Sequence, residues 1–153
     1  MRKITLICVG NLKEKYLVDA TEEYKKRLQK FFDLKIIELP EFKLKDENSF
    51  QKGLDIEAYN ILTKIKSNNV CSLCIEGEEK SSEDFAQFVE KNSNLGEMYF
   101  VIGSSYGLSE KVKKNSTKIS FGKMTFPHQL MRVIFLEQLY RAGTIINNTS
   151  YHK

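Results

Sequence analysis

Residues 119–153 read ISFGKMTFPHQLMRVIFLEQLYRAGTIINNTSYHK, and this stretch decides how the rest of the chain can pack. It holds a glycine turn, a helix that starts at a proline, and a polar tail with an aromatic residue. Successive residues of a helix are about 100° apart, so the apolar side chains of this helix cover its whole circumference and predict burial on several sides. These side chains are Leu130, Met131, Val133, Ile134, Phe135, Leu136, Leu139 and Tyr140.

The same helix carries two charged pairs, each four residues apart. His128 precedes Arg132 and Glu137 precedes Arg141, on roughly opposite sides of the helix. Burial of such groups costs free energy unless they are paired or used. We interpret Glu137 and Arg141 first as a structural or dimer-interface ion pair. His128 either orients a loop or acts on a substrate, and the sequence leaves both open.

Strand-like and helix-like segments alternate along the whole chain. The strand candidates are residues 4–9, 34–39, 70–75, 98–102 and 118–121; the helix candidates are residues 14–31, residues 50–65, a segment capped by Ser81, and the last helix. This alternation predicts an α/β fold in which helices connect the strands of a parallel sheet. A chain of 153 residues suits one domain, residues 1–153.

Three apolar strand candidates are followed by glycine. TLICV precedes Gly10, CSLCI ends two residues before Gly77, and MYFVI precedes Gly103. Parallel sheets bind ligands beyond the carboxyl ends of their strands, where glycine allows tight turns and close approach. Each glycine alone is explained by an ordinary turn, but together they indicate a ligand site, and both interpretations stay open. The chain has neither G-x-G-x-x-G after its first strand nor G-x-x-x-x-G-K-[ST], which argues against the common nucleotide folds.

The composition limits the class of protein. There are 24 Lys and Arg against 20 Asp and Glu, and the net charge of +4 is weak evidence for a nucleic-acid partner. No apolar run is long enough for a signal peptide or a membrane span, so we expect a cytoplasmic protein with no membrane contact. Cys71 and Cys74 lie in a strand-like run where residues three apart face opposite sides. We therefore expect these thiols and Cys8 to be small core residues, with no metal site.

The phrases VIGSSYGLS (residues 101–109) and SFGKMTFPHQLMRVIFLEQLYRA (residues 120–142), with the final SYHK, resemble the RlmH family of SPOUT methyltransferases. The likeness begins at ITLICVGNLKEKYL (residues 4–17) and covers essentially the whole chain. It implies an S-adenosylmethionine-dependent enzyme that methylates N3 of a pseudouridine in a stem-loop of large-subunit (23S) ribosomal RNA. It further implies a homodimer of single SPOUT domains, each with a C-terminal trefoil knot, acting on assembled ribosomes.

The resemblance also assigns candidate site residues. The cofactor is expected to contact Leu73, Gly103, Phe121, Gly122, Lys123, Met124, Thr125 and Phe126, which agrees with the glycine-rich edge described above. In the tail, His152 is the candidate base for the N3 proton, and Tyr151 is a candidate for stacking on a flipped nucleotide. Arg132 and Arg141 are candidates for holding phosphate or the charged base.

The chain departs from the family pattern in two places. Ser104 stands where relatives commonly have a second glycine, so a need for positive φ there is in doubt. Asn147 and Asn148 stand where relatives often have glycine, and Asn is the next best residue for a left-handed turn.

Several alternatives stay open. The tail with His152 could be a frayed end, and the lysines at positions 111, 113, 114 and 118 are either solvated or RNA-facing. A second candidate function is a SPOUT enzyme for another RNA position, such as a ribose hydroxyl in transfer RNA. A third is a non-catalytic ribosome-binding protein. Cofactor binding separates the third from the others, and nucleoside analysis separates the first two.

Overall fold

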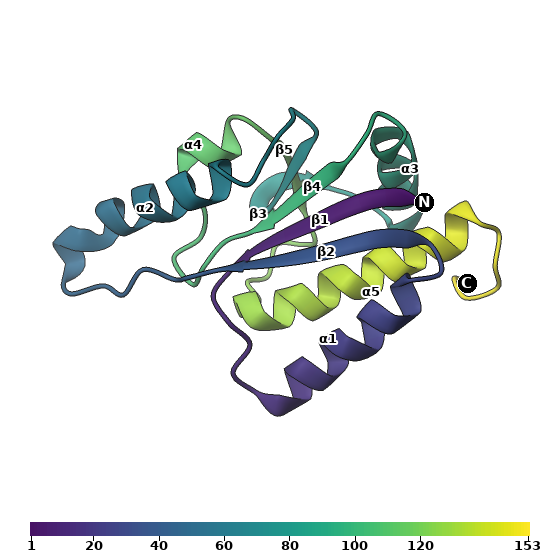
Figure 1. The fold of residues 1–153 in the computed structure, drawn as a ribbon, viewed down its shortest axis with the longest axis horizontal. Helices are drawn as coiled ribbons and strands as arrows, with labels where there is room; N and C mark the ends of the chain where they lie inside the picture. Colours follow the sequence, from purple (N-terminus) through teal and green to yellow (C-terminus); the bar gives the residue numbers. More distant parts are fainter.

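The computed structural model describes residues 1–153 and shows a five-stranded parallel sheet between two layers of helices (Figure 1). The strand order is β2-β1-β4-β3-β5. The strands are β1 Arg2–Val9, β2 Phe32–Leu39, β3 Val70–Glu79, β4 Met98–Ile102 and β5 Thr117–Ser120. The helices are α1 Lys15–Leu28, α2 Phe50–Leu62, α3 Ser82–Ser93, α4 Glu110–Lys113 and α5 His128–Ile146, and η1 Glu47–Ser49 is a short 3-10 helix. The predicted α/β class and parallel sheet are confirmed.

Alternate residues of the central strands supply two separate cores. In β1, Ile4 and Leu6 pack with side chains of α1, α3 and α5, whereas Ile7 and Val9 pack with side chains of α2 and α4. The two-residue period of a strand produces this division. Coverage of both faces is what the continuous apolar runs of β1 and β4 predict.

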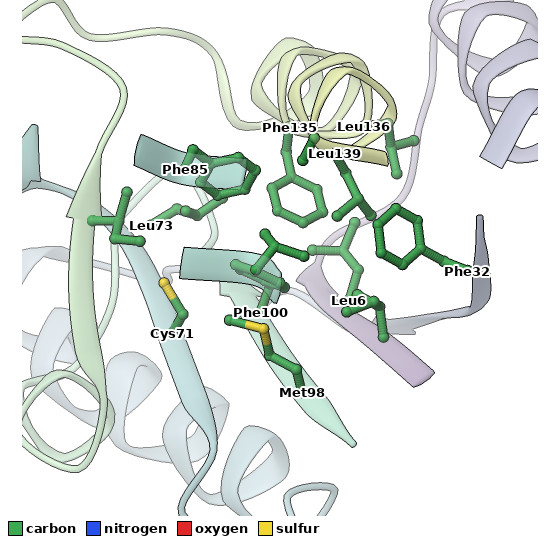
Figure 2. Close-up of a cluster of buried hydrophobic side chains, with 14 of the residues drawn as sticks. Leu6, Phe32, Cys71, Leu73, Phe85, Met98, Phe100, Phe135, Leu136 and Leu139 are labelled. Atoms are coloured by element: carbon green, nitrogen blue, oxygen red, sulfur yellow. The ribbon is translucent and has the colours of Figure 1, made fainter. Parts of the chain in front are cut away.

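Helix α5 supplies the centre of the larger core. Figure 2 shows Phe135 and its neighbours Leu136 and Leu139 projecting from α5 toward the sheet, where Leu6 and Phe100 lie. The rings of Phe100 and Phe135 have centroids 4.7 Å apart. Full burial of each such side chain contributes about 1.5–3 kcal/mol, so α5 is a main source of stability for this face of the sheet.

The outward side of α5 is less buried than the sequence predicts. Helices α1 and α3 flank α5 on the same face of the sheet. Val133 and Ile134 stay partly exposed, and Leu130 retains 36% of its accessible surface. The prediction of burial on several sides is confirmed for the inward and lateral residues, whereas this outward strip stays partly exposed in the single chain.

Strand β3 extends four residues beyond the predicted end at position 75. Its pairing with β5 is irregular between Leu73 and Glu78, which shifts the register. An ideal Cβ on Gly77 would lie 2.6 Å from the backbone nitrogen of Ile119, so glycine lets β5 approach β3 here. Gly77 therefore lies within a strand, whereas the sequence placed it in a turn.

Local signals at helix ends agree with the structure. The hydroxyl of Ser81 accepts a hydrogen bond from the backbone nitrogen of Asp84 at 3.0 Å and caps α3. Asn148 has φ 54°, so the left-handed turn expected after α5 is present.

Helices α1 and α2 each end three residues earlier than the sequence predicts. None of the helices combines the length and the hydropathy needed to cross a membrane.

Candidate functional site

A cavity of ≈ 630 Å³ lies beyond the carboxyl ends of β3, β4 and β5. Three segments line it, residues 73–76, residues 102–108 except Tyr106, and residues 120–128 except Lys123, together with Lys113 of α4 and Met131 of α5. This volume lies within the range of pockets for small organic ligands and cofactors. The strand-end glycines predict a ligand site at this edge, and of the three only Gly103 lines the cavity; Gly10 and Gly77 do not.

Most of the predicted cofactor residues meet at this cavity. Those that line it are Leu73, Gly103, Phe121, Gly122, Met124, Thr125 and Phe126. Lys123 is exposed and does not line it. Residues 50 positions apart in sequence are thus brought together by the parallel pairing of neighbouring strands β3, β4 and β5. Their role in binding a cofactor stays a prediction.

The turn after β4 forms one wall of the cavity. An ideal Cβ on Gly103 would lie 2.6 Å from the carbonyl carbon of Gly107, so the two ends of the turn can approach only because residue 103 is glycine. Ser104 has no left-handed φ, since Asn148 is the only non-glycine residue with positive φ. Serine therefore fits at position 104 without a left-handed backbone.

A charged pair lies at the cavity wall and includes Lys113, one of the lysines for which the sequence left open a solvated or an RNA-facing position. Lys113 of α4 forms an ion pair with Glu76, which follows the regular part of β3. Burial opposes the charge on Lys113, but the hydrogen bond and attraction from Glu76 outweigh it and raise the pKa of the amine. Cys74 lies beside this pair, and burial raises the pKa of its thiol. All three cysteines are free thiols.

His128 faces the cavity from the first turn of α5. Burial lowers the pKa of its imidazole; Glu41 opposes this shift, whereas Arg132 and Lys13 reinforce it. A neutral imidazole can accept a proton or a hydrogen bond at neutral pH. The sequence left two roles open for His128, orienting a loop or acting on a substrate, and its position allows both.

Arg132 is held inside the chain. Its side chain is 3% exposed and pairs with Glu38 of β2. Its Nη2 donates to the carbonyl oxygen of Gly10 at 3.0 Å. These contacts join the start of α5 to the ends of β1 and β2, so the guanidinium does not face RNA in this structure.

A second polar cluster lies at the other end of α5. The hydroxyl of Tyr151 donates to Glu137 Oε1 at 2.8 Å, and Arg141 Nη2 donates to the same oxygen at 3.0 Å. His152 lies between two side chains: its Nδ1 is 3.1 Å from Arg141 Nη1, and its Nε2 is 2.6 Å from Glu83 Oε1. The hydrogen bond to Glu137, with burial, raises the pKa of Tyr151. The tail is thus bound to α3 and α5 and is not frayed.

The cavity and the tail cluster are far apart in one chain. His128 begins α5 at the carboxyl edge of the sheet, and thirteen residues later Arg141 lies about 20 Å away at a rise of about 1.5 Å per residue. Figure 1 shows the same separation: the C-terminus lies in the half of the molecule that holds the N-terminus. The structure therefore gathers the predicted cofactor residues at one place and three predicted catalytic residues at another.

Comparisons with known proteins agree with this architecture. A family model described as "Predicted SPOUT methyltransferase" matches residues 2–152. The chain is 48% identical to "Ribosomal RNA large subunit methyltransferase H 1" of Clostridium perfringens (strain SM101 / Type A), over 98% of this chain and 99% of that protein. It is 44% and 45% identical to proteins called "Ribosomal RNA large subunit methyltransferase H" from Streptococcus uberis and Streptococcus agalactiae serotype III, over 99% of each chain. The chain belongs to the SPOUT methyltransferase family.

Proposed function

We propose that this SPOUT methyltransferase transfers a methyl group from S-adenosylmethionine to N3 of a pseudouridine in large-subunit ribosomal RNA. The observation that carries the proposal is the likeness, over nearly the whole of both chains, to proteins named ribosomal RNA large subunit methyltransferase H. We expect the enzyme to act in the cytoplasm, on assembled ribosomes.

The cavity suits the cofactor. Its walls combine apolar side chains such as Leu73 and Phe121 with the backbone of the turns at Gly103 and Gly122. Apolar walls with a few convergent polar groups favour a flat heterocycle, and exposed backbone groups can form hydrogen bonds with its edge. When bound, S-adenosylmethionine supplies an electrophilic methyl group on a sulfonium.

The tail residues provide the remaining chemistry. The N3 proton of pseudouridine must leave before or during methyl transfer, and His152 is the proposed acceptor. Arg141 is the proposed donor to charge on the flanking oxygens or to phosphate. Tyr151 is the proposed stacking partner of the flipped base. For Arg132 we propose a positioning role, because Glu38 and the Gly10 carbonyl oxygen occupy its guanidinium.

A homodimer would bring the two clusters together. Within one chain the tail cannot reach a methyl group in the cavity, because about 20 Å separates them. A two-fold contact through α5 would place the tail end of one helix beside the cavity end of the other. The partly exposed outward residues of α5, which include Leu130 and Ile134, offer an apolar strip for such a contact.

We also propose that the C-terminal segment is knotted. Strand β5 lies at one edge of the sheet, beside β3. Helix α5 starts near the end of β1, where Arg132 contacts Gly10. Residues 121–127 must therefore cross the carboxyl ends of β3 and β4, a path that supports the threading implied by the resemblance.

RNA binding would use the lysines beside the cavity. Lys111 of α4, Lys114 directly after α4 and Lys118 of β5 are exposed, and they lie near Lys113 at the cavity wall. Contacts from such side chains to phosphates are independent of sequence and weaken with salt. Target choice would then rest with the composite site.

The proposal is tested by incubating the purified protein and labelled S-adenosylmethionine with ribosomes and separate subunits from cells that lack the enzyme. Digestion and nucleoside analysis should find the label in N3-methylpseudouridine of large-subunit RNA. Label in another nucleoside would show that the enzyme has a different target, such as a ribose hydroxyl. Cofactor binding without label, or no cofactor binding, would favour a non-catalytic ribosome-binding protein.

A further inference from the structure

We infer that Glu57 of α2 is a positioning residue that holds the turn after β4 in the shape needed to bind the cofactor. The inference rests on the proposed function, since it concerns the wall of the proposed cofactor cavity. Glu57 does not line that cavity and acts through Ser104, which does.

Both oxygens of Glu57 accept hydrogen bonds from loops at the carboxyl edge of the sheet. Its Oε1 accepts from the hydroxyl of Ser104 at 2.8 Å, and its Oε2 accepts from the backbone nitrogen of Phe42 at 2.8 Å. Ser104 belongs to the turn between β4 and α4, and Phe42 to the connection between β2 and α2. One side chain on α2 therefore joins two loops that are otherwise separate in sequence.

The burial of this carboxylate makes it unusual. Glu57 is 3% exposed and Ser104 is 5% exposed, and no Lys, Arg or His pairs with the carboxylate. Burial raises the pKa of Glu57, whereas the two hydrogen bonds lower it. A buried carboxylate without a cation is costly, and an apolar residue of similar size would suit a purely structural position at least as well. Its two acceptor oxygens are what an apolar residue could not provide.

A second carboxylate holds the next residue of the same turn. Glu41 Oε1 accepts from the hydroxyl of Ser105 at 2.6 Å and from its backbone nitrogen at 3.3 Å. Two consecutive residues of the turn are thus bound by side chains of different elements. Both serines line the cavity, together with Gly103 and Gly107, whose backbones nearly touch. Glu57 supplies the buried half of this arrangement, and Glu41 the exposed half.

The expected effect of losing Glu57 is weaker binding of the cofactor. Without Glu57, the buried Ser104 hydroxyl still accepts a hydrogen bond from the backbone nitrogen of Tyr106 at 3.3 Å, but its own proton has no acceptor, so the turn must move to find one. Affinity for a ligand falls by the fraction of molecules in which the binding shape is populated. The methyl-transfer step uses groups elsewhere, so the effect should appear in the KM for S-adenosylmethionine and not in kcat.

The experiment compares three variants of the full chain. Glu57→Met removes both acceptors and roughly keeps the side-chain volume, and Ser104→Ala removes only the hydroxyl. Glu97→Met is the matched control, because Glu97 also accepts two hydrogen bonds, from the hydroxyls of Thr5 at 2.6 Å and Tyr99 at 3.2 Å, but at the amino edge of the sheet. Calorimetry with S-adenosylmethionine measures the Kd, and thermal unfolding is measured in parallel.

Glu57→Met and Ser104→Ala should each weaken S-adenosylmethionine binding about fivefold to tenfold, the size expected for the net loss of one ordinary hydrogen bond. The double variant should lose less affinity than the two single losses combined, because both substitutions remove the contact between Ser104 and Glu57. Each substitution also removes one hydrogen bond of its own, from Phe42 to Glu57 and from Tyr106 to Ser104. Glu97→Met should unfold at a lower temperature and bind like wild type. If Glu57→Met does not fold, Ser104→Ala carries the test.

The inference would be overturned if the wild type binds S-adenosylmethionine and if Ser104→Ala and any folded Glu57→Met bind it with the same Kd as the wild type. That result would leave the proposed function intact. So would equal losses of affinity in Glu57→Met and Glu97→Met, since these would reflect stability alone. Absence of binding by the wild type would instead refute the proposed function, and the inference with it.

Discussion

A composite active site at a two-fold interface predicts an unusual pattern of activity in mixed dimers. One variant, Thr125→Trp, places a bulky indole at a lining position of the cavity. The other, Tyr151→Ala with His152→Ala, removes both tail side chains that are proposed to contact the base. Two differently tagged chains are co-expressed, and heterodimers are isolated by successive purification on the two tags.

The magnitude follows from symmetry. If each site takes its cavity from one chain and its tail from the other, a heterodimer of the two variants has one site with both defects and one with none. Its activity should be about half that of the wild-type dimer. A heterodimer with all substitutions in one chain and none in the other has one defect in each site, and its activity should fall to background.

The assay is incorporation of labelled methyl groups into ribosomal RNA, with homodimers of each variant as the inactive references. Sites made within one chain would give the opposite result: background activity for the first heterodimer and about half for the second. That reversal would refute the composite site, which we infer from the distance of about 20 Å between His128 and Arg141 along α5.

Four substitutions in α5 give further predictions. Arg132→Met should lower the free energy of unfolding by about 2–3 kcal/mol, because Glu38 loses its partner. The loss is limited because Glu38 keeps partial access to water. Unchanged urea unfolding together with lost methylation would instead show a direct role for Arg132. Burial holds the pKa of the His128 imidazole below its ordinary 6.5. As the pH falls below about 6.5, the unfolded chain therefore binds a proton more readily than the folded chain, and the free energy of unfolding decreases. His128→Gln should remove that part of the slope in unfolding experiments at pH 5.5–7.5, and an identical slope would contradict the shift. Phe135→Ala, at a fully buried position, should cost about 3–5 kcal/mol, whereas Leu130→Ala should mainly weaken dimerisation, as sedimentation can show.

The sequence predicts the cavity better than it predicts the tail. Apolar runs followed by glycine identify where β1 and β4 end, and parallel pairing then brings those ends to one edge. That logic uses only local patterns and the general geometry of a sheet. It correctly places Gly103 at a ligand-sized cavity. It misplaces Gly77 because the continuation of β3 depends on contact with β5, which no local pattern records.

The contacts of the polar residues could not be predicted in the same way. Arg132 finds Glu38 across 94 positions, His152 finds Glu83 across 69, and Ser104 finds Glu57 across 47. Periodicity indicates which side of an element a residue occupies, but it does not identify a partner on another element. For Arg132 this matters directly, since a free arginine on a helix suggests RNA contact and a buried one suggests support.

Helix α5 connects stability, assembly and chemistry in this fold. Its inward side chains hold the larger core, so its direction is set by the sheet. Because it runs antiparallel to the strands, its first turn must lie at the carboxyl edge, where the cavity is, and its last turn at the amino edge. In the proposed dimer, a two-fold axis across its outward strip would reverse one copy relative to the other, so that each cavity would meet the partner's tail. Dimerisation would then be a condition for methyl transfer, and dilution below the dissociation constant should abolish activity while each chain still binds the cofactor.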